Sequence, residues 1–302
     1  MKIALADLPW PYLSETRVLC QGAAGGTWHD LHSLLAEIGM VNPPPPASLS
    51  AALAYLSSLG HGGRRKIERA LAARKNGVAD PQLRKPMDPL AKILLTEGRA
   101  ALSRSNEQLP AKMVVGFSKF QTATADPGAD IVLPDSAAHF DVEAVLAAVL
   151  GKPAARVGAG LAARSIVGFT LLAEITHRDM FDAEWKTSNS LFAKNCLGLS
   201  PLGPAIWVAG AGELEPATEI TLAVNGVERQ RFAVADFAHG LAAATKAWSR
   251  CVLEPGDMVA LGAAIARPGP NNAVDSPIPV AAGDRIEVSC APIGTLAARI
   301  AS

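Results

Sequence analysis

The chain has 302 residues, of which 49% are hydrophobic and 19% are charged, and its formal net charge is zero. This length allows a sizeable core and predicts two domains, or one large domain with an appendage. The charge balance gives no electrostatic reason to expect nucleic acid or an anionic membrane as a partner, and no apolar stretch is long enough to span a bilayer.

The cysteines and the N-terminus point to a cytoplasmic protein. The four cysteines are far apart in the sequence and form no CxxC pair; they are Cys20, Cys196, Cys251 and Cys290. Reduced thiols are therefore expected rather than a disulfide or zinc framework. Asp7 and two prolines interrupt the first apolar residues, so the N-terminus lacks the core of a signal peptide.

Residues 1–105 are predicted to form a smaller, mostly helical section. A short strand is expected at residues 2–6, followed by helices over residues 30–38, 48–59 and 89–103. Serine caps and a glycine stop delimit the second of these helices, and a proline lies in the first turn of the third.

From about residue 112 the pattern changes to short strands. A strand is expected at residues 112–116, a loop at 117–133, and longer strands at 139–150 and 166–176. Period-two alternation in the first long strand places Asp141, Glu143, Val145, Ala147 and Val149 on one face and apolar residues on the other.

The last third of the chain continues this strand-rich pattern. Asn225-Gly226 predicts a hairpin between strands at residues 219–224 and 227–234. A helix is expected at 236–251, and further strands at 258–263, at 285–290 and after Gly294. Strands dominate without a βαβ rhythm, so the fold class predicted for the chain is α+β.

Residues 168–204 bring together the groups that build many pockets: an apolar strand carrying Glu174, the pair Arg178-Asp179, and Lys194. A structural interpretation stays open for each of them. Glu143 and Glu174 could be a buried pair neutralised by Lys194 or Arg178, and Arg178-Asp179 could be a local ion pair that fixes the strand end.

Several short motifs occur along the chain in the order typical of one protein family. They are Val115-Gly116-Phe117, 140–151, Val167-Gly168-Phe169-Thr170 with Arg178-Asp179, Lys194 with Pro201-Leu202-Gly203-Pro204, Val224-Asn225-Gly226 with Arg229-Gln230, 253–257, and Ala282-Gly283-Asp284 with Gly294-Thr295-Leu296. With these motifs the chain resembles the fumarylacetoacetate hydrolase family over residues 106–302. The resemblance implies a rolled, mainly-β catalytic-type domain, commonly a homodimer, with residues 1–105 as an unmatched lid or dimer support.

The resemblance also implies a chemistry. Enzymes of this family cleave or hydrate small oxo-acids, and a divalent metal held by three carboxylates binds the keto-acid head. A hard cation polarises the ligand oxygens while a lysine stabilises enolate charge. The implied cofactor is Mg²⁺ or Mn²⁺, if the site binds a metal at all, and the implied partner is a small-molecule substrate.

When the family motifs are matched to this chain residue by residue, the resemblance implies catalytic roles for Lys194, Glu143 and Glu174. It also implies that the two glutamates are metal ligands. Val145 replaces the second carboxylate ligand, and Asp141, on the same strand face, is the candidate to replace it. A two-residue slip displaces a ligand by roughly 6–7 Å, which a metal site does not tolerate without rebuilding. The implied substrate-binding residues are Arg178, Lys119 and Gln230.

Other family positions also differ in this chain. Leu197 replaces an aspartate, residues 119–123 lack the histidine expected in a loop, and Gly262-Ala263 replaces a Gly-Thr motif. Three functions follow as hypotheses. The first is an enzyme of oxo- or enol-acid metabolism, as in aromatic catabolism, acting by C–C hydrolysis, hydration, decarboxylation or tautomerisation. The second is a metal-free enzyme or ligand-binding member. The third is a non-catalytic structural protein whose pocket is filled by Val145, Leu197 and Ala263.

Overall fold

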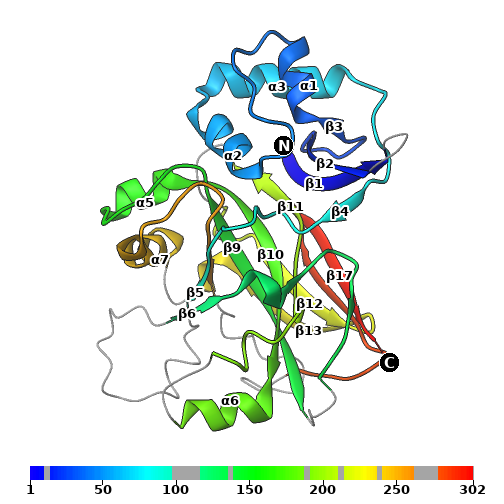
Figure 1. Ribbon diagram of the computed structural model, residues 1–302, viewed down its shortest axis with the longest axis vertical. Coiled ribbons are helices and arrows are strands. Elements are labelled where there is room, and N and C mark those ends of the chain that lie inside the picture. Colours follow the sequence, from blue (N-terminus) through cyan, green and yellow to red (C-terminus); the bar gives the residue numbers. More distant parts are fainter. Residues whose placement is uncertain are drawn as a thin grey trace.

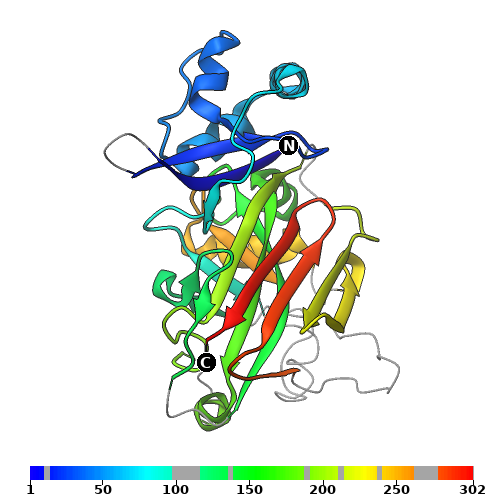
Figure 2. The same ribbon diagram turned by 90° about the vertical axis from the view of Figure 1, so that its right-hand side faces the viewer.

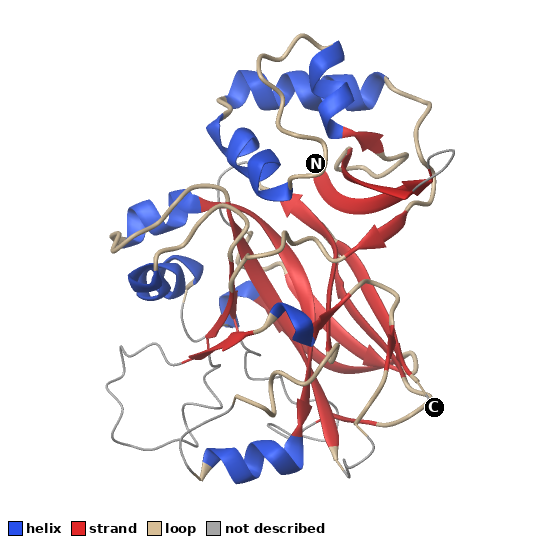
Figure 3. Cartoon of the chain, in the orientation of Figure 1, coloured by secondary structure: helices blue, strands red, loops and turns tan. Residues whose placement is uncertain are grey.

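The computed structural model describes residues 1–9, 14–96, 116–134, 139–186, 191–209, 214–236, 240–261 and 278–301. Within these ranges, two sheets form the body of the molecule and the helices lie around them (Figure 1, Figure 3). The helices are α1 (Leu31–Glu37), α2 (Leu49–Ser58), α3 (His61–Ala73), α5 (Ala159–Ser165), α6 (Arg178–Trp185) and α7 (Leu241–Trp248). The predicted α+β class is confirmed.

Among the described residues, the larger sheet has 12 strands. Its main path runs β3 (His29–Asp30), β2 (Ser14–Gln21), β1 (Lys2–Pro9), β11 (Ser200–Val208), β10 (Ile166–His177), β9 (Phe140–Leu150), β14 (Met258–Leu261), β5 (Ile93–Thr96) and β6 (Gly116–Lys119). Three short strands pair beside this path: β15 (Ile278–Val280) with β9, β4 (Gln82–Arg84) with β1, and β7 (Thr124–Ala125) with β11.

In the described part of the chain, the smaller sheet has 5 strands, in the order β13 (Val227–Ala233), β12 (Glu219–Val224), β16 (Arg285–Cys290), β17 (Gly294–Ile300) and β8 (Asp130–Ile131). It lies against one face of the central strands of the larger sheet, as Figure 2 shows for β16 and β17. The hairpin β12–β13 turns at Asn225-Gly226, both with positive φ, as the sequence predicts.

The central strands β9 and β10 are buried on both faces, which explains their nearly continuous apolar sequences. One face of β9, with Val142 and Leu146, packs against side chains of the smaller sheet such as Leu222. The other face, with Val145 and Val149, packs into a second core that contains residues of α1, α2 and α3. The alternation predicted for this strand is confirmed.

The N-terminal section combines strands with helices, so the prediction of a mostly helical section is only partly confirmed. Asp30 and Ser48 cap α1 and α2 by accepting hydrogen bonds from Ser33 N and Ala51 N. The helix predicted at residues 89–103 is wrong over its described part, because Ile93–Thr96 is strand β5, paired in parallel with β14, while residues 97–103 lie outside the described residues. Burial between neighbouring strands decides the conformation of such a short apolar run.

Two further predictions need correction or lie outside the described residues. The loop predicted at residues 117–133 contains the end of β6, a 3₁₀ turn at Gln121–Ala123, and strands β7 and β8. Of the strand predicted at residues 112–116, only Gly116 is described. The division between residues 105 and 106 also falls outside the described ranges and stays a prediction.

Candidate active site

The antiparallel pairing of β9 with β10 brings the predicted carboxylates together. Glu143 lies directly opposite Glu174, and Asp141 lies opposite Thr176. Side chains at directly opposed positions share a sheet face with their Cβ atoms about 4.5–5.5 Å apart, and like charges there repel. Two facing glutamates therefore need nearby positive charge.

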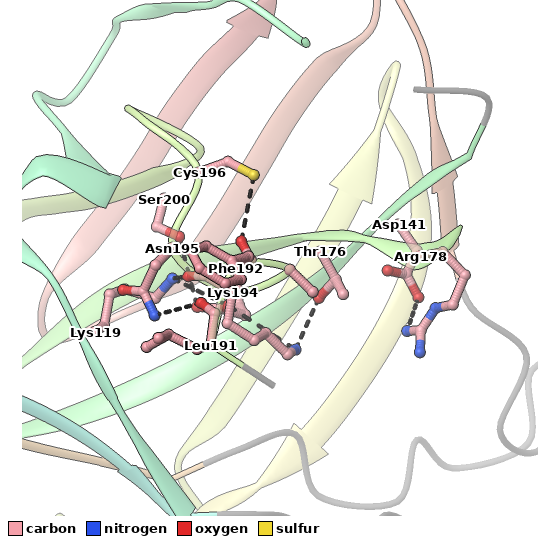
Figure 4. A network of polar contacts seen from close by, with 12 residues as sticks. Lys119, Asp141, Thr176, Arg178, Leu191, Phe192, Lys194, Asn195, Cys196 and Ser200 are labelled. Carbon is pink, nitrogen blue, oxygen red and sulfur yellow. Dashed lines mark hydrogen bonds and ion pairs between the residues drawn. The ribbon is translucent and has the colours of Figure 1, made fainter. Parts of the chain in front are cut away.

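Glu174 is 1% exposed and lies between two lysines, Lys119 and Lys194. Figure 4 labels both lysines. Its Oε1 atom is 3.1 Å from Lys119 Nζ and 3.9 Å from Lys194 Nζ, while Ser200 Oγ is 3.5 Å from Oε2. The Lys119 side chain is completely buried and also donates a hydrogen bond to the Lys194 carbonyl. Burial lowers the pKa of Lys119, and the Glu174 carboxylate offsets only part of this shift.

Lys194 is held in place from several sides. Its Nζ atom donates to Thr176 Oγ1 at 2.7 Å and lies over the rings of Phe117, at 5.5 Å, and Phe181, at 5.4 Å. Aromatic faces attract an ammonium group while excluding water from it. The lysine is 7% exposed, so its side chain is buried in a fixed position.

The backbone segment that carries Lys194 is fixed by hydrogen bonds to two other elements. The Glu184 carboxylate, from α6, accepts from Phe192 N and Ala193 N at 2.8 and 2.9 Å. On the other side, the Asn195 side chain donates to Ser118 O of β6 at 3.2 Å. Lys194 and Lys119 are thereby brought to the same carboxylate from segments far apart in the sequence.

A second charge pair lies beside this group. Arg178 Nη2, at the start of α6, donates to Asp141 Oδ2, and its guanidinium lies 4.8 Å from the centre of the Phe181 ring. Burial raises the pKa of Asp141 against the opposing effect of Arg178. The ion pair predicted between Arg178 and Asp179 is not formed, because Asp179 instead bonds the ring and backbone N–H of His139. Both pairs tie the start of β9 to α6.

The hydrogen bond of the Gln230 side chain is to the backbone and not to these charged groups. Its Oε1 atom accepts a hydrogen bond of 3.0 Å from the backbone N–H of Ala144, and the residue is buried. This bond ties β13 of the smaller sheet to β9 and satisfies a buried amide. The substrate-binding role predicted for Gln230 stays a prediction, and Lys119, predicted to lie in a loop, ends strand β6.

The residues around Glu143 and Glu174 offer few open ligands to a divalent metal. Hard cations such as Mg²⁺ take oxygen ligands. Val145 is fully buried opposite Leu172, and Asp141 is engaged by Arg178, so neither adds an open carboxylate to the two glutamates. In the described part of the chain, no group of three His, Cys, Asp or Glu side chains is placed to hold a metal ion. The donor set therefore does not fit the three-carboxylate site that the family resemblance implies.

Leu197 and Ala263 are two further positions at which this chain differs from the family motifs. The side chain of Leu197 is 80% exposed, so the expectation that it fills the pocket is wrong. Its backbone neighbour Gly198 instead bonds Thr122 O and leaves Leu197 at the surface. Ala263 lies outside the described residues.

Sequence reasoning missed several residues of the site. Thr176 follows Glu174 by two residues on the same strand face, so the period of two could have identified it. Phe117, Phe181 and Ser200 contact the charged groups only through the tertiary fold. From here on, Lys119, Asp141, Glu143, Glu174, Arg178 and Lys194 are called the charged cluster.

The sequence and the fold match known proteins. The sequence profile described as "Fumarylacetoacetate (FAA) hydrolase C-terminal" matches residues 95–301, about two thirds of the chain. An uncharacterized protein of Pyrococcus horikoshii is 31% identical over 211 residues, which cover 69% of this chain and 86% of that protein. The chain belongs to the fumarylacetoacetate hydrolase family, as the sequence motifs predicted.

Some of the matched proteins carry functional names. Oxaloacetate tautomerase YisK of Bacillus subtilis is 26% identical over 163 residues, covering 54% of this chain and 52% of that protein. The crystal structure of maleylpyruvate hydrolase from Sphingobium sp. SYK-6 in complex with manganese(II) ion and pyruvate superposes with a TM-score of 0.71 at 23% identity, covering 100% of this chain and 99% of that one. At this identity the second match supports the fold alone.

In the part of the chain that the structure describes, no helix is both long and apolar enough to cross a membrane. All four cysteines are free thiols, as predicted. The homodimer and the cytoplasmic location stay predictions.

Proposed function

We propose that the protein is an enzyme acting on a small oxo-acid or enol-acid, and that the reaction is keto–enol tautomerisation. The observation that carries the proposal is the buried Glu174 carboxylate between the amino groups of Lys119 and Lys194, opposite Glu143 on the neighbouring strand. The tautomerase named among the relatives performs a reaction of this type, and the family relationship supports the same class of substrate here.

Tautomerisation requires a group that moves a proton and a group that stabilises the negative oxygen of the enolate. Lys194 supplies the positive charge in this proposal, because its ammonium is fixed by Thr176 and by two aromatic rings. A positive charge that is already oriented and poorly hydrated stabilises an enolate more strongly than one in water.

The two glutamates take different parts. Glu143 is half-buried and therefore the more accessible of the pair, so it is the proposed proton carrier at the ligand carbon. Glu174 is buried and holds both lysines, which makes it the anchor of the site. Arg178 is the proposed contact for the ligand's carboxylate, since its side chain is 21% exposed and lies next to the cluster.

The test is an ultraviolet assay of enol-to-keto conversion, with oxaloacetate and short acylpyruvates as substrates and the spontaneous rate subtracted. Lys194→Met keeps the length of the side chain and removes its charge, so kcat/KM should fall about 10²–10³-fold, as for loss of an oxyanion-stabilising group. Lys194→Arg should retain part of the activity because it keeps the charge.

The matched control is Arg299→Gln, which removes a cation from the exposed pair with Asp130 and should leave kcat/KM unchanged. No acceleration by the wild-type protein, or equal activity of Lys194→Met and wild type, would contradict the proposal. Tight binding of an oxo-acid without turnover would instead indicate the ligand-binding function.

A further inference from the structure

The pairing of β9 with β10 shows which side chains line the place where the family's metal ligands lie. Glu143 faces Glu174, but the next position on the same face pairs Val145 with Leu172. Both apolar residues are fully buried in the core that includes residues of the N-terminal helices. A divalent ion between the two strands would therefore meet carboxylate oxygens on one side and methyl groups on the other.

The Glu174 carboxylate already has a cationic partner. Lys119 Nζ lies 3.1 Å from Oε1, and the entire Lys119 side chain is inaccessible to solvent. Its other partner is the carbonyl oxygen of Lys194, so the nitrogen is surrounded by oxygen acceptors. The ammonium group forms an ion pair with the carboxylate and donates a hydrogen bond to the carbonyl. A buried carboxylate without such a partner would be strongly destabilising.

The charges of the cluster also balance. Asp141, Glu143 and Glu174 carry three formal negative charges, and Lys119, Arg178 and Lys194 carry three positive ones. Adding a divalent ion would leave two uncompensated positive charges in a region of low dielectric constant. Losing one carboxylate to valine and keeping a buried lysine both lower the affinity for such an ion.

We infer that the Lys119 ammonium takes the place of a divalent metal ion as the counter-ion of Glu174, so that this site works without metal. Lys119 is thus a positioning residue that fixes Glu174 and, through the Lys194 carbonyl, the segment that presents Lys194. The inference concerns the same site as the proposed tautomerisation, but metal binding is measured without turnover, so the two can fail independently.

The test measures Mn²⁺ binding by the electron paramagnetic resonance signal of the free ion, after chelator treatment and dialysis. Wild type should bind far less than one equivalent at about 100 μM Mn²⁺. The double variant Val145→Glu with Lys119→Met restores a carboxylate and removes the competing cation, so it should bind about one equivalent. Val145→Glu alone should bind at least about tenfold more weakly, because the positive charge beside Glu174 repels the ion.

Val145→Gln in the Lys119→Met background is the control for side-chain size, since it has no charge, and it should not bind. Stoichiometric Mn²⁺ binding by the wild type would overturn the inference. Equal affinities of Val145→Glu with and without Lys119→Met would overturn the role given to Lys119.

Lys119→Met by itself provides a second measurement should the double variant fail to fold. It leaves Glu174 without its nearest cation, so Mn²⁺ should raise its melting temperature more than that of the wild type. Equal shifts in the two proteins would contradict the exchange of lysine for metal.

Discussion

Replacing Glu174 by glutamine removes the negative charge at the centre of the charged cluster while keeping the size and shape of the side chain. Lys119 then loses its ion pair but remains completely buried, with the Lys194 carbonyl as a remaining acceptor. Removing one partner of a buried ion pair typically lowers the free energy of unfolding by about 3–5 kcal/mol. Because the glutamine oxygen can still accept from Lys119, the lower value of about 3 kcal/mol is expected.

The assay is thermal unfolding followed by calorimetry, in which a loss of about 3 kcal/mol corresponds to a melting temperature lower by about 6 °C. Combining Glu174→Gln with Lys119→Met removes both charges. The double variant should therefore lose less free energy of unfolding than the two single variants lose together, and this difference, the coupling energy, should be about 2 kcal/mol. Asp130→Asn at the exposed pair with Arg299 is the control and should leave the melting temperature almost unchanged.

A melting temperature of Glu174→Gln within about 1 °C of wild type, a shift that corresponds to well under 1 kcal/mol, would refute this reasoning. It would mean that Lys119 and Glu174 are not a charge pair in solution. Strictly additive effects in the double variant would contradict it in the same way, since independent sites show no coupling.

Two further predictions concern residues away from the site. Cys20 is fully buried, and burial raises its pKa to about 12, whereas Cys251 is exposed. At pH 8 a thiol reagent should therefore label Cys251 in the native protein and Cys20 only after unfolding, as measured by peptide mass spectrometry. The Arg299 hydrogen bond lowers the pKa of Asp130, so this exposed pair stabilises the fold above the unfolded value of about 3.9 and its contribution is lost as the pH falls. The melting temperatures of wild type and Arg299→Gln should therefore converge in acid, and a difference that grows below pH 4 would contradict this assignment.

Much of the geometry of the candidate site could be predicted because strand periodicity is a local property. Asp141 and Glu143 share a face through their spacing of two, and Glu174 lies on a strand long enough to pair with theirs. The position of Lys194 near these carboxylates followed from the family motifs. These predictions needed only spacing within each segment and the order of the segments.

The partners of each charge could not be predicted in the same way. Arg178 was expected to pair with its neighbour Asp179, but the antiparallel return of the chain brings Asp141 closer. Lys119 was expected in a loop and instead ends β6, whose strand neighbour β5 lies in a segment predicted as helix. These errors have one cause, since strand pairing across long sequence separations overrides local preferences.

The exposed position of Leu197 shows that the sequence also does not predict whether an apolar replacement is buried. In the sequence, an apolar residue at a family aspartate position suggests a filled pocket. In the fold, the turn at Leu197 directs the side chain to the surface, whereas Val145 is buried. Of these two replacements, only Val145 therefore lies in the buried part of the candidate site.

The most direct test is the rate of oxaloacetate enol-to-keto conversion by wild-type protein, measured with excess chelator and again with added Mn²⁺. If the charged cluster supplies the positive charge by itself, the protein accelerates the conversion over the spontaneous rate, and the acceleration is the same in both conditions. An acceleration that disappears with chelator and returns with Mn²⁺ would contradict a site in which Lys119 replaces the metal. No acceleration in either condition would contradict the tautomerase function.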